Sequence, residues 1–67
     1  MSDNAIAKAV RARRNYIGMK VGELAAKCGW VERTFQKKME NPERMTLEDM
    51  RKIEKILGME KGELARL

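Results

Sequence analysis

The chain has 67 residues, 37% of them charged, and its 15 Lys and Arg against 10 Asp and Glu give a net charge of +5. This length predicts one domain over residues 1–67 with a small hydrophobic core, which leaves no room for a large cleft. The sequence has no His and only one Cys, which excludes a disulfide framework and removes the common routes to a zinc site or a His-based catalytic dyad. We therefore expect a protein that is not an enzyme and that has no metal and no cofactor.

The positive charge is concentrated in the first part of the chain. Residues 1–20 carry five bases against one acid, residues 21–39 four against two, and residues 40–67 six against seven. Such an excess indicates a polyanionic partner, although many basic proteins are simply soluble. We expect a polyanion to approach the first three helices. No apolar run is long enough for a signal peptide or a membrane-spanning segment, so no membrane partner is expected.

The first predicted helix covers about residues 4–16. Asp3 and Asn4 offer an N-cap for it. Its apolar stripe consists of Ile6, Ala7, Ala9, Val10 and Ile17. The opposite face carries the bases Lys8, Arg11 and Arg14. This face is either an ordinary solvent-exposed face or a set of contacts with phosphates.

Two short helices separated by Gly29 follow in residues 20–40. The apolar residues of the first of them, at the i, i+3, i+4, i+7 spacing of one buried stripe, are Val21, Leu24, Ala25 and Cys28. In the next helix Phe35 and Met39 share a buried face, while long polar side chains occupy the other faces. We expect Cys28 to be an apolar core residue rather than a reactive thiol. Trp30 is expected to fill the turn against the core rather than stack on a base.

The last third predicts a turn and two further helices. Asn41-Pro42 stops the third helix, and Thr46 with Asp49 resembles a capping box for a helix that begins at Leu47. Its apolar side holds Leu47, Met50, Ile53, Ile56 and Leu57. Its other side mixes both charge signs, as in an ordinary solvated face, and holds Glu48, Arg51, Lys52, Glu54 and Lys55. Gly58 ends this helix, and a short fifth helix opens at Glu60.

A pattern that spans nearly the whole chain carries a resemblance to a known family. It consists of Met19-Lys20, Glu23-Leu24-Ala25, Lys27, Gly29, Thr34-Phe35, Asn41-Pro42, Thr46-Leu47-Glu48, Met50, Ile53 and Leu57-Gly58-Met59. This order resembles the helix-turn-helix domains of the Cro and phage-repressor (Xre-like) family. The resemblance implies an all-α, five-helix lambda-repressor-like DNA-binding domain whose helix-turn-helix is formed by the second and third helices. It also implies a bacterial or phage-encoded protein of the cytoplasm.

The resemblance further implies that the third helix enters the major groove of double-stranded DNA. Carried over by position, the base contacts are Val31, Glu32, Arg33, Gln36 and Lys37. Arg33 suits a guanine, Gln36 an adenine and Glu32 a cytosine amine, and Val31 suits a thymine methyl group. The implied backbone contacts are Arg14, Lys20 and Lys38, and Lys37 also suits a phosphate. Arg14 fits an ion pair with Glu23 equally well.

Three residues depart from the family pattern. Lys20 and Val31 stand where capping residues of the second and third helices are usual, and Val21 stands where a Gln often binds the DNA backbone. A lost cap typically costs about 1 kcal/mol, and the missing Gln removes one phosphate contact. These departures bear on the affinity for DNA and on how the third helix docks.

The leading hypothesis for function is a sequence-specific DNA-binding transcriptional regulator, a phage or prophage repressor of the Cro/C1 type. One module of this size buries only about 600–1,000 Å² on DNA, so useful specificity calls for two copies. Leu64 and Leu67 in the last helix either form a homodimer contact or close the core of their own chain. The alternative function is a protein-interaction module, antitoxin-like or polymerase-associated, that binds an acidic protein surface with weak or no DNA binding.

Overall fold

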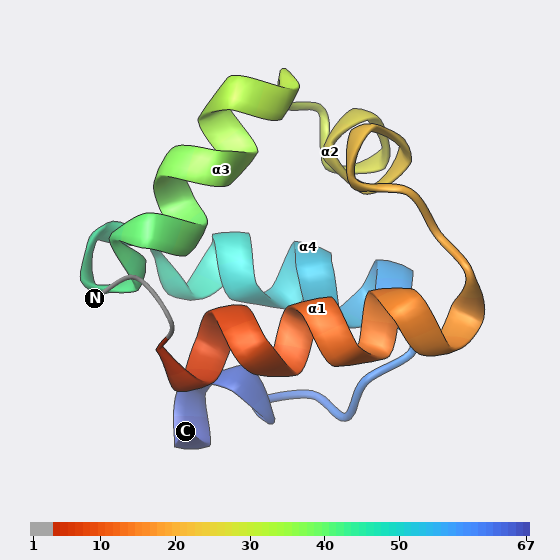
Figure 1. Cartoon of the computed structure of the whole chain (residues 1–67). Coiled ribbons are helices and arrows are strands. Elements are labelled where there is room, and N and C mark those ends of the chain that lie inside the picture. Colours follow the sequence, from red (N-terminus) through yellow and green to blue (C-terminus); the bar gives the residue numbers. More distant parts are fainter. Residues whose placement is uncertain (1–3) are drawn as a thin grey trace.

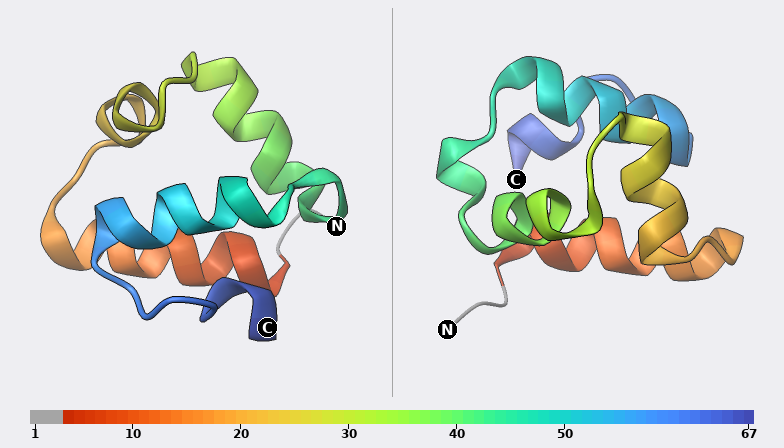
Figure 2. Two further views of the ribbon diagram at one scale, coloured as in Figure 1. Left: turned by 180° about the vertical axis from the view of Figure 1, so that it is seen from behind. Right: turned by 90° about the horizontal axis from the view of Figure 1, so that it is seen from above.

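The computed structural model describes residues 4–67, so that Asp3, a predicted cap, lies outside the described residues. Its elements are α1 (Ala5–Ile17), α2 (Val21–Cys28), α3 (Glu32–Glu40), α4 (Leu47–Leu57) and two short 3-10 turns, η1 (Pro42–Arg44) and η2 (Leu64–Arg66). Helices α1 and α4 lie side by side, and α2 and α3 lie across them in a second layer (Figures 1 and 2). Residues 4–67 contain no strand, which confirms the prediction of an all-α chain.

The helices begin and end close to where the sequence predicted. Asn4 caps α1, because its Oδ1 accepts a hydrogen bond from the Ala7 N–H at 2.8 Å, and its Nδ2 donates to the Met39 carbonyl at 2.9 Å. Thr46 and Asp49 form the reciprocal bonds of a capping box at the start of α4, as predicted. Helix α2 ends at Gly29, whose φ of 82° is a left-handed conformation that glycine adopts without strain.

The core lies between the helices, and the C-terminal segment completes it on the side of α1 and α4 away from α2 and α3 (Figure 1). Its buried apolar residues are Val10, Leu24, Ala25, Cys28, Phe35, Met45, Ile53, Leu57 and Leu64. The predicted burial of Cys28 and Phe35 is confirmed. Ile17 and Leu47, in contrast, are 41% and 53% exposed although the apolar stripes included them. They are the last residue of α1 and the first residue of α4.

The chain after α4 does not form the predicted fifth helix. From Gly58 it returns along α1 and α4 in turns, and only Leu64–Arg66 makes a single 3-10 turn (Figure 1). So short a segment nucleates an α-helix poorly. Gly62 is left-handed at a φ of 87°, and its N–H donates to a carboxylate of α4 instead of entering a helix.

That carboxylate belongs to Glu54. The sequence predicted Glu54 on the solvated side of this helix, and this prediction is wrong. Glu54 is only 2% exposed. Its Oε1 accepts from the Gly62 N–H and its Oε2 from the Leu64 N–H, both at 2.9 Å. Two charge-assisted bonds to backbone donors offset the loss of hydration of this carboxylate. Glu54 therefore holds the C-terminal segment against α4.

Two further polar contacts join helices at their ends. Arg13 Nε donates to the Leu57 carbonyl at 2.8 Å, at the C-terminal end of α4, where the last carbonyls have no partner inside the helix. Lys38 Nζ lies 2.9 Å from Asp49 Oδ2, which joins α3 to α4. Across residues 4–67, no helix has both the length and the apolar character needed to cross a membrane.

Candidate nucleic-acid interface

The connection between α2 and α3 is short and closed by backbone hydrogen bonds. The Gly29 N–H donates to the Ala26 carbonyl at 3.0 Å, and the Trp30 N–H donates to the Ala25 carbonyl at 2.9 Å. Val31 then stands in extended geometry directly before the first residue of α3. Because Ala25 is 1% exposed, α2 lies against its neighbours there without a large side chain between them. These contacts fix where α3 starts.

Helix α3 has one exposed face and one packed face. Phe35 is buried at 4% exposure, and Thr34, Lys38 and Met39 are partly buried. The residues that we call the outer face of α3 are all exposed and follow the i, i+1, i+4, i+5 spacing: Glu32, Arg33, Gln36 and Lys37. Val31, which precedes them, is 68% exposed. The structure therefore brings the five predicted base contacts together on solvent-exposed positions at one helix.

Glu32 lies close to the start of α2. A Cβ added to Gly22 would stand only 3.2 Å from Glu32 Oε1, so the absence of a side chain at Gly22 makes room for this carboxylate. A negative charge beside the first turn of α2 is favourable, because the first N–H groups of a helix carry partial positive charge. Gln36 Nε2 donates to Glu32 Oε2 at 3.4 Å. Glu32 and Gln36 thus contact each other. The cations of the outer face are Arg33 and Lys37.

The three predicted backbone contacts have different surroundings. Lys20 is exposed at the position before α2. Arg14 is partly buried, and its Nη1 donates to the Met19 carbonyl at 3.0 Å. Among the ion pairs of residues 4–67 there is none between Arg14 and Glu23, the pairing that the sequence also allowed. Arg14 supports the connection between α1 and α2 instead.

Lys38 is held inside the fold more firmly than a free surface lysine. Its Nζ is bonded to Asp49 and also lies 4.9 Å from the centre of the Trp30 ring. Lys52 Nζ lies 5.8 Å from the same ring. Trp30 is partly buried and packs against the core, in agreement with its predicted place in the turn. Lys38 must leave Asp49 if its ammonium group is to bind a phosphate fully.

A concave surface at the C-terminal end of α3 adds residues that sequence reasoning missed. It has a volume of about 270 Å³ and is lined by Thr34, Lys37, Lys38, Asn41 and Arg44. Arg44 is exposed in the turn η1 and supplies a third cation next to the outer face of α3. The signal available in the sequence was the Pro42 turn, which stops α3 and so brings the next base back beside it.

The predicted dimer contacts are split between the core and the surface. Leu64 is 0% exposed and belongs to the core of its own chain, whereas Leu67 is 58% exposed. Leu64 is therefore not accessible to a second subunit in this fold. The sequence could not separate the two residues, because their burial depends on the turn that Glu54 imposes on the C-terminal segment.

Cys28 is buried, and the described residues hold no group of potential metal ligands. Within residues 4–67, no three His, Cys, Asp or Glu side chains gather closely enough to hold a metal ion. Burial raises the pKa of the Cys28 thiol from its ordinary value of 9.0, with the charge of Lys52 acting in the opposite direction. The thiol is therefore protonated at neutral pH, as expected of a core residue.

Comparison of the chain with protein-family models, with curated proteins and with solved structures gives no match.

Proposed function

We propose that this protein is a sequence-specific DNA-binding transcriptional regulator of the Cro and phage-repressor type. In this proposal α2 and α3 form the helix-turn-helix of a lambda-repressor-like domain, and α3 enters the major groove of an operator. The observation that carries the proposal is the outer face of α3. Its four residues are exposed, while Phe35 on the opposite side is buried and holds the helix at a defined orientation.

The chemistry of the outer face supports reading of base edges. Arg33 offers the two-pronged guanidinium that suits a guanine, and Val31 at 68% exposure offers an apolar group for a thymine methyl. Lys37 and Arg44 beside it, with Lys20 before α2, supply cations for the phosphates on either side of the groove. Glu32 is the one acid of the face, and it suits a cytosine amine.

Selection of bound duplexes from a random pool tests this proposal. We expect enrichment of one sequence, with an affinity that falls steeply with salt. Contacts to about six phosphates give a slope of about −5 in the plot of log affinity against log salt concentration. If no duplex is bound at low salt, the proposal is wrong, and the alternative of a protein-interaction module on this fold becomes the better one.

Substitutions on and beside α3 then test the assigned roles. Arg33→Ala is expected to relax the selected sequence at one position and to cost about 1–3 kcal/mol on the preferred site. Lys20→Ala should weaken binding to all duplexes about equally and make the salt slope less steep by about 1. Both residues are exposed, so neither change should affect folding. An unchanged preferred sequence for Arg33→Ala would show that another face of α3 reads the bases.

A further inference from the structure

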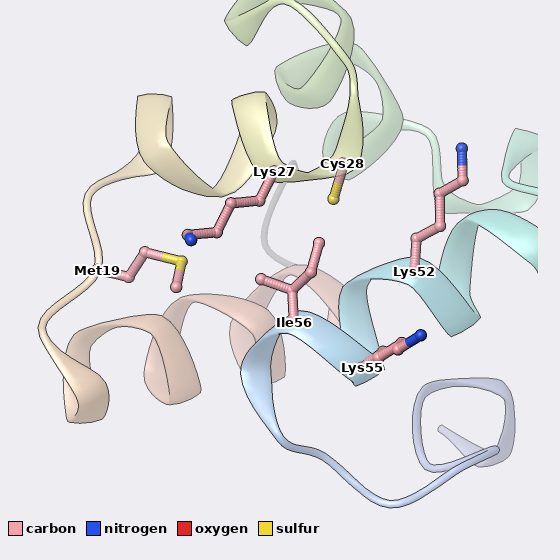
Figure 3. Close-up of a pocket in the computed structure, with 6 residues that line it drawn as sticks. All are labelled: Met19, Lys27, Cys28, Lys52, Lys55 and Ile56. Carbon is pink, nitrogen blue, oxygen red and sulfur yellow. The ribbon is translucent and has the colours of Figure 1, made fainter.

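A pocket lies between the C-terminal end of α2 and α4, and it shares no residue with the outer face of α3 (Figure 3). Its volume is about 560 Å³, and it is lined by Met19, Lys27, Cys28, Lys52, Lys55 and Ile56. Binding pockets typically have volumes of roughly 300–1,000 Å³. The pocket is therefore large enough to receive a side chain with the backbone on either side of it.

The floor of this pocket is apolar. Figure 3 shows the Cys28 sulfur and the Ile56 side chain pointing into the space between α2 and α4, and Met19 at the α1–α2 connection, on the other side of Lys27. Met19 and Ile56 are partly exposed, so an apolar group of a ligand would cover surface that water now contacts. The flexible Met19 side chain can adapt to ligands of different shape.

The rim of the pocket is positively charged. Lys27, Lys52 and Lys55 are all exposed, and no carboxylate lines the pocket. Among residues 4–67, none of the three lysines forms an ion pair or a side-chain hydrogen bond. Lys52 alone makes a cation–π contact, with the Trp30 ring. Their ammonium groups lie at separate points around the rim and do not converge (Figure 3). A complementary ligand therefore carries negative charge at several separated points.

These features discriminate between classes of ligand. A single small anion calls for donors that converge on one point, which the three lysines do not provide. A nucleic-acid backbone has separated negative charges but no projecting apolar side chain for the floor. We infer that the pocket binds an acidic peptide segment of a partner protein, with one apolar side chain between α2 and α4 and flanking carboxylates on Lys27, Lys52 and Lys55.

This inference does not depend on DNA binding, because no residue of the outer face of α3 takes part in it. The peptide can be recognised whether α3 binds an operator or not. A regulator with such a pocket could contact a second protein while the outer face of α3 is occupied.

Titration of the intact protein with three fluorescein-labelled peptides, EELEE, EESEE and QQLQQ, tests the inference by anisotropy at low salt. EELEE is expected to bind saturably. EESEE should bind at least about fivefold more weakly, because it lacks the apolar side chain for the floor. QQLQQ should also bind at least about fivefold more weakly, because it lacks the carboxylates. Since the changes are in the peptide, folding of the protein is the same in all three titrations.

Variants of the protein locate the site. Lys27→Ala and Lys55→Ala are each expected to weaken EELEE binding by about two- to fivefold, as for exposed charge pairs. Lys8→Ala removes a lysine of α1 that is also exposed but does not line the pocket, and it should leave the affinity nearly unchanged. Amide resonances of Cys28 and Ile56 should shift on addition of EELEE.

Several results would overturn the inference. Equal affinity for EELEE and EESEE would mean that the lysines attract any polyanion and that the floor is not used. Equally tight binding of octanoate at the same resonances would assign the pocket to small amphipathic anions. Weaker binding of a DNA duplex by both Lys27→Ala and Lys55→Ala, with displacement of EELEE by that duplex, would make the pocket part of a nucleic-acid contact. Absence of saturable EELEE binding would dismiss the site altogether.

Discussion

Glu54 is a carboxylate in the core whose oxygens accept hydrogen bonds from backbone donors of the C-terminal segment. Both of its oxygens are used, one by Gly62 and one by Leu64. An uncharged carboxyl or an amide at this position could not accept two such bonds with equal strength. This single side chain therefore decides that the chain after α4 forms turns and brings Leu64 into the core.

Replacement of Glu54 tests that role. Glu54→Gln keeps the size of the side chain but turns an NH₂ group toward a backbone N–H, so we expect the free energy of unfolding to fall by about 1–3 kcal/mol. Urea denaturation followed by circular dichroism measures the change. Glu40→Gln, at an exposed position of α3, is the matched control and should stay within about 0.5 kcal/mol of the wild type. A Glu54→Gln protein as stable as the control would contradict this account.

The glycine inside α2 and the glycine directly after it give opposite predictions at the scale of the element. Gly22 lies inside the helix, where Ala is the better helix former, and only the flexible end of Glu32 stands near an added Cβ. Gly29 has a φ of 82°, which Ala adopts with strain even though no atom lies within 4 Å of an added Cβ.

We therefore expect Gly22→Ala to raise the free energy of unfolding by about 0.5–1 kcal/mol and Gly29→Ala to lower it by about 1–2 kcal/mol. Thermal unfolding of both variants beside the wild type gives the two signs. Each protein serves as the control of the other, because both changes add one methyl group, one inside α2 and one directly after it. Changes of the same sign would mean that the end of α2 is not held at Gly29.

The junction of α3 and α4 predicts a dependence of stability on pH. Partial burial tends to raise the pKa of Asp49, but hydrogen bonds from Lys38 and Thr46 and the charge of Lys38 outweigh it, so that the pKa lies below the ordinary value of 3.8. A carboxyl whose pKa is lowered by folding stabilises the protein fully above its unfolded pKa. This stabilisation is lost as the pH falls below 3.8 and passes through the folded pKa.

Asp49→Asn should accordingly be less stable than the wild type at neutral pH, by about 1 kcal/mol for the weakened cap. The difference should shrink as the pH falls below 3.8 and passes through the lowered pKa of Asp49, where the carboxyl itself becomes protonated. Urea denaturation at a series of pH values measures both curves, and Glu43→Gln in the exposed turn η1 is the control for loss of a carboxylate. A constant difference across the series would rule out Asp49 as the titrating group.

Much of the helical organisation could be predicted because local signals carry it. Gly29, the Asn4 cap and the Thr46–Asp49 capping box act over a few residues, and each predicted boundary was confirmed. Glu54 and the fate of the last segment could not be predicted, because they depend on a contact between α4 and residues eight to ten positions later. Charge alternation along α4 gave no sign that one of its acids is buried.

At the scale of the whole molecule, the candidate site was only partly accessible to sequence reasoning. The periodicity of α3 identified which residues share the outer face, since Phe35 fixes the buried side. It could not show that Lys38 is paired with Asp49 or that Arg44 stands beside α3, because both depend on how η1 and α4 fold back. The pocket between α2 and α4 was missed because its lysines come from two helices and each looked like ordinary solvated charge.

Oligomerisation is a property of the whole molecule, and the exposed Leu67 leads to a prediction about it. Leu67 is 58% exposed, so Leu67→Asp should leave the unfolding free energy of the single chain within about 0.5 kcal/mol of the wild type. If Leu67 packs against a second copy, the same change should raise the dissociation constant of the homodimer, as measured by sedimentation equilibrium. Leu64→Ala, in contrast, should lower the unfolding free energy by about 2–5 kcal/mol because Leu64 is in the core. A wild-type protein that sediments as a monomer at high concentration would refute the dimer contact.

Trp30 is the single tryptophan of the chain, and its indole lies close to ammonium groups from two helices, Lys38 of α3 and Lys52 of α4. Indole emission responds to nearby charge and to water, so the fluorescence of Trp30 is an intrinsic probe of its surroundings. Lys52 also lines the pocket beside Cys28, and Lys38 borders the concave surface at the end of α3. One intrinsic optical signal thus reports on both surfaces without any label.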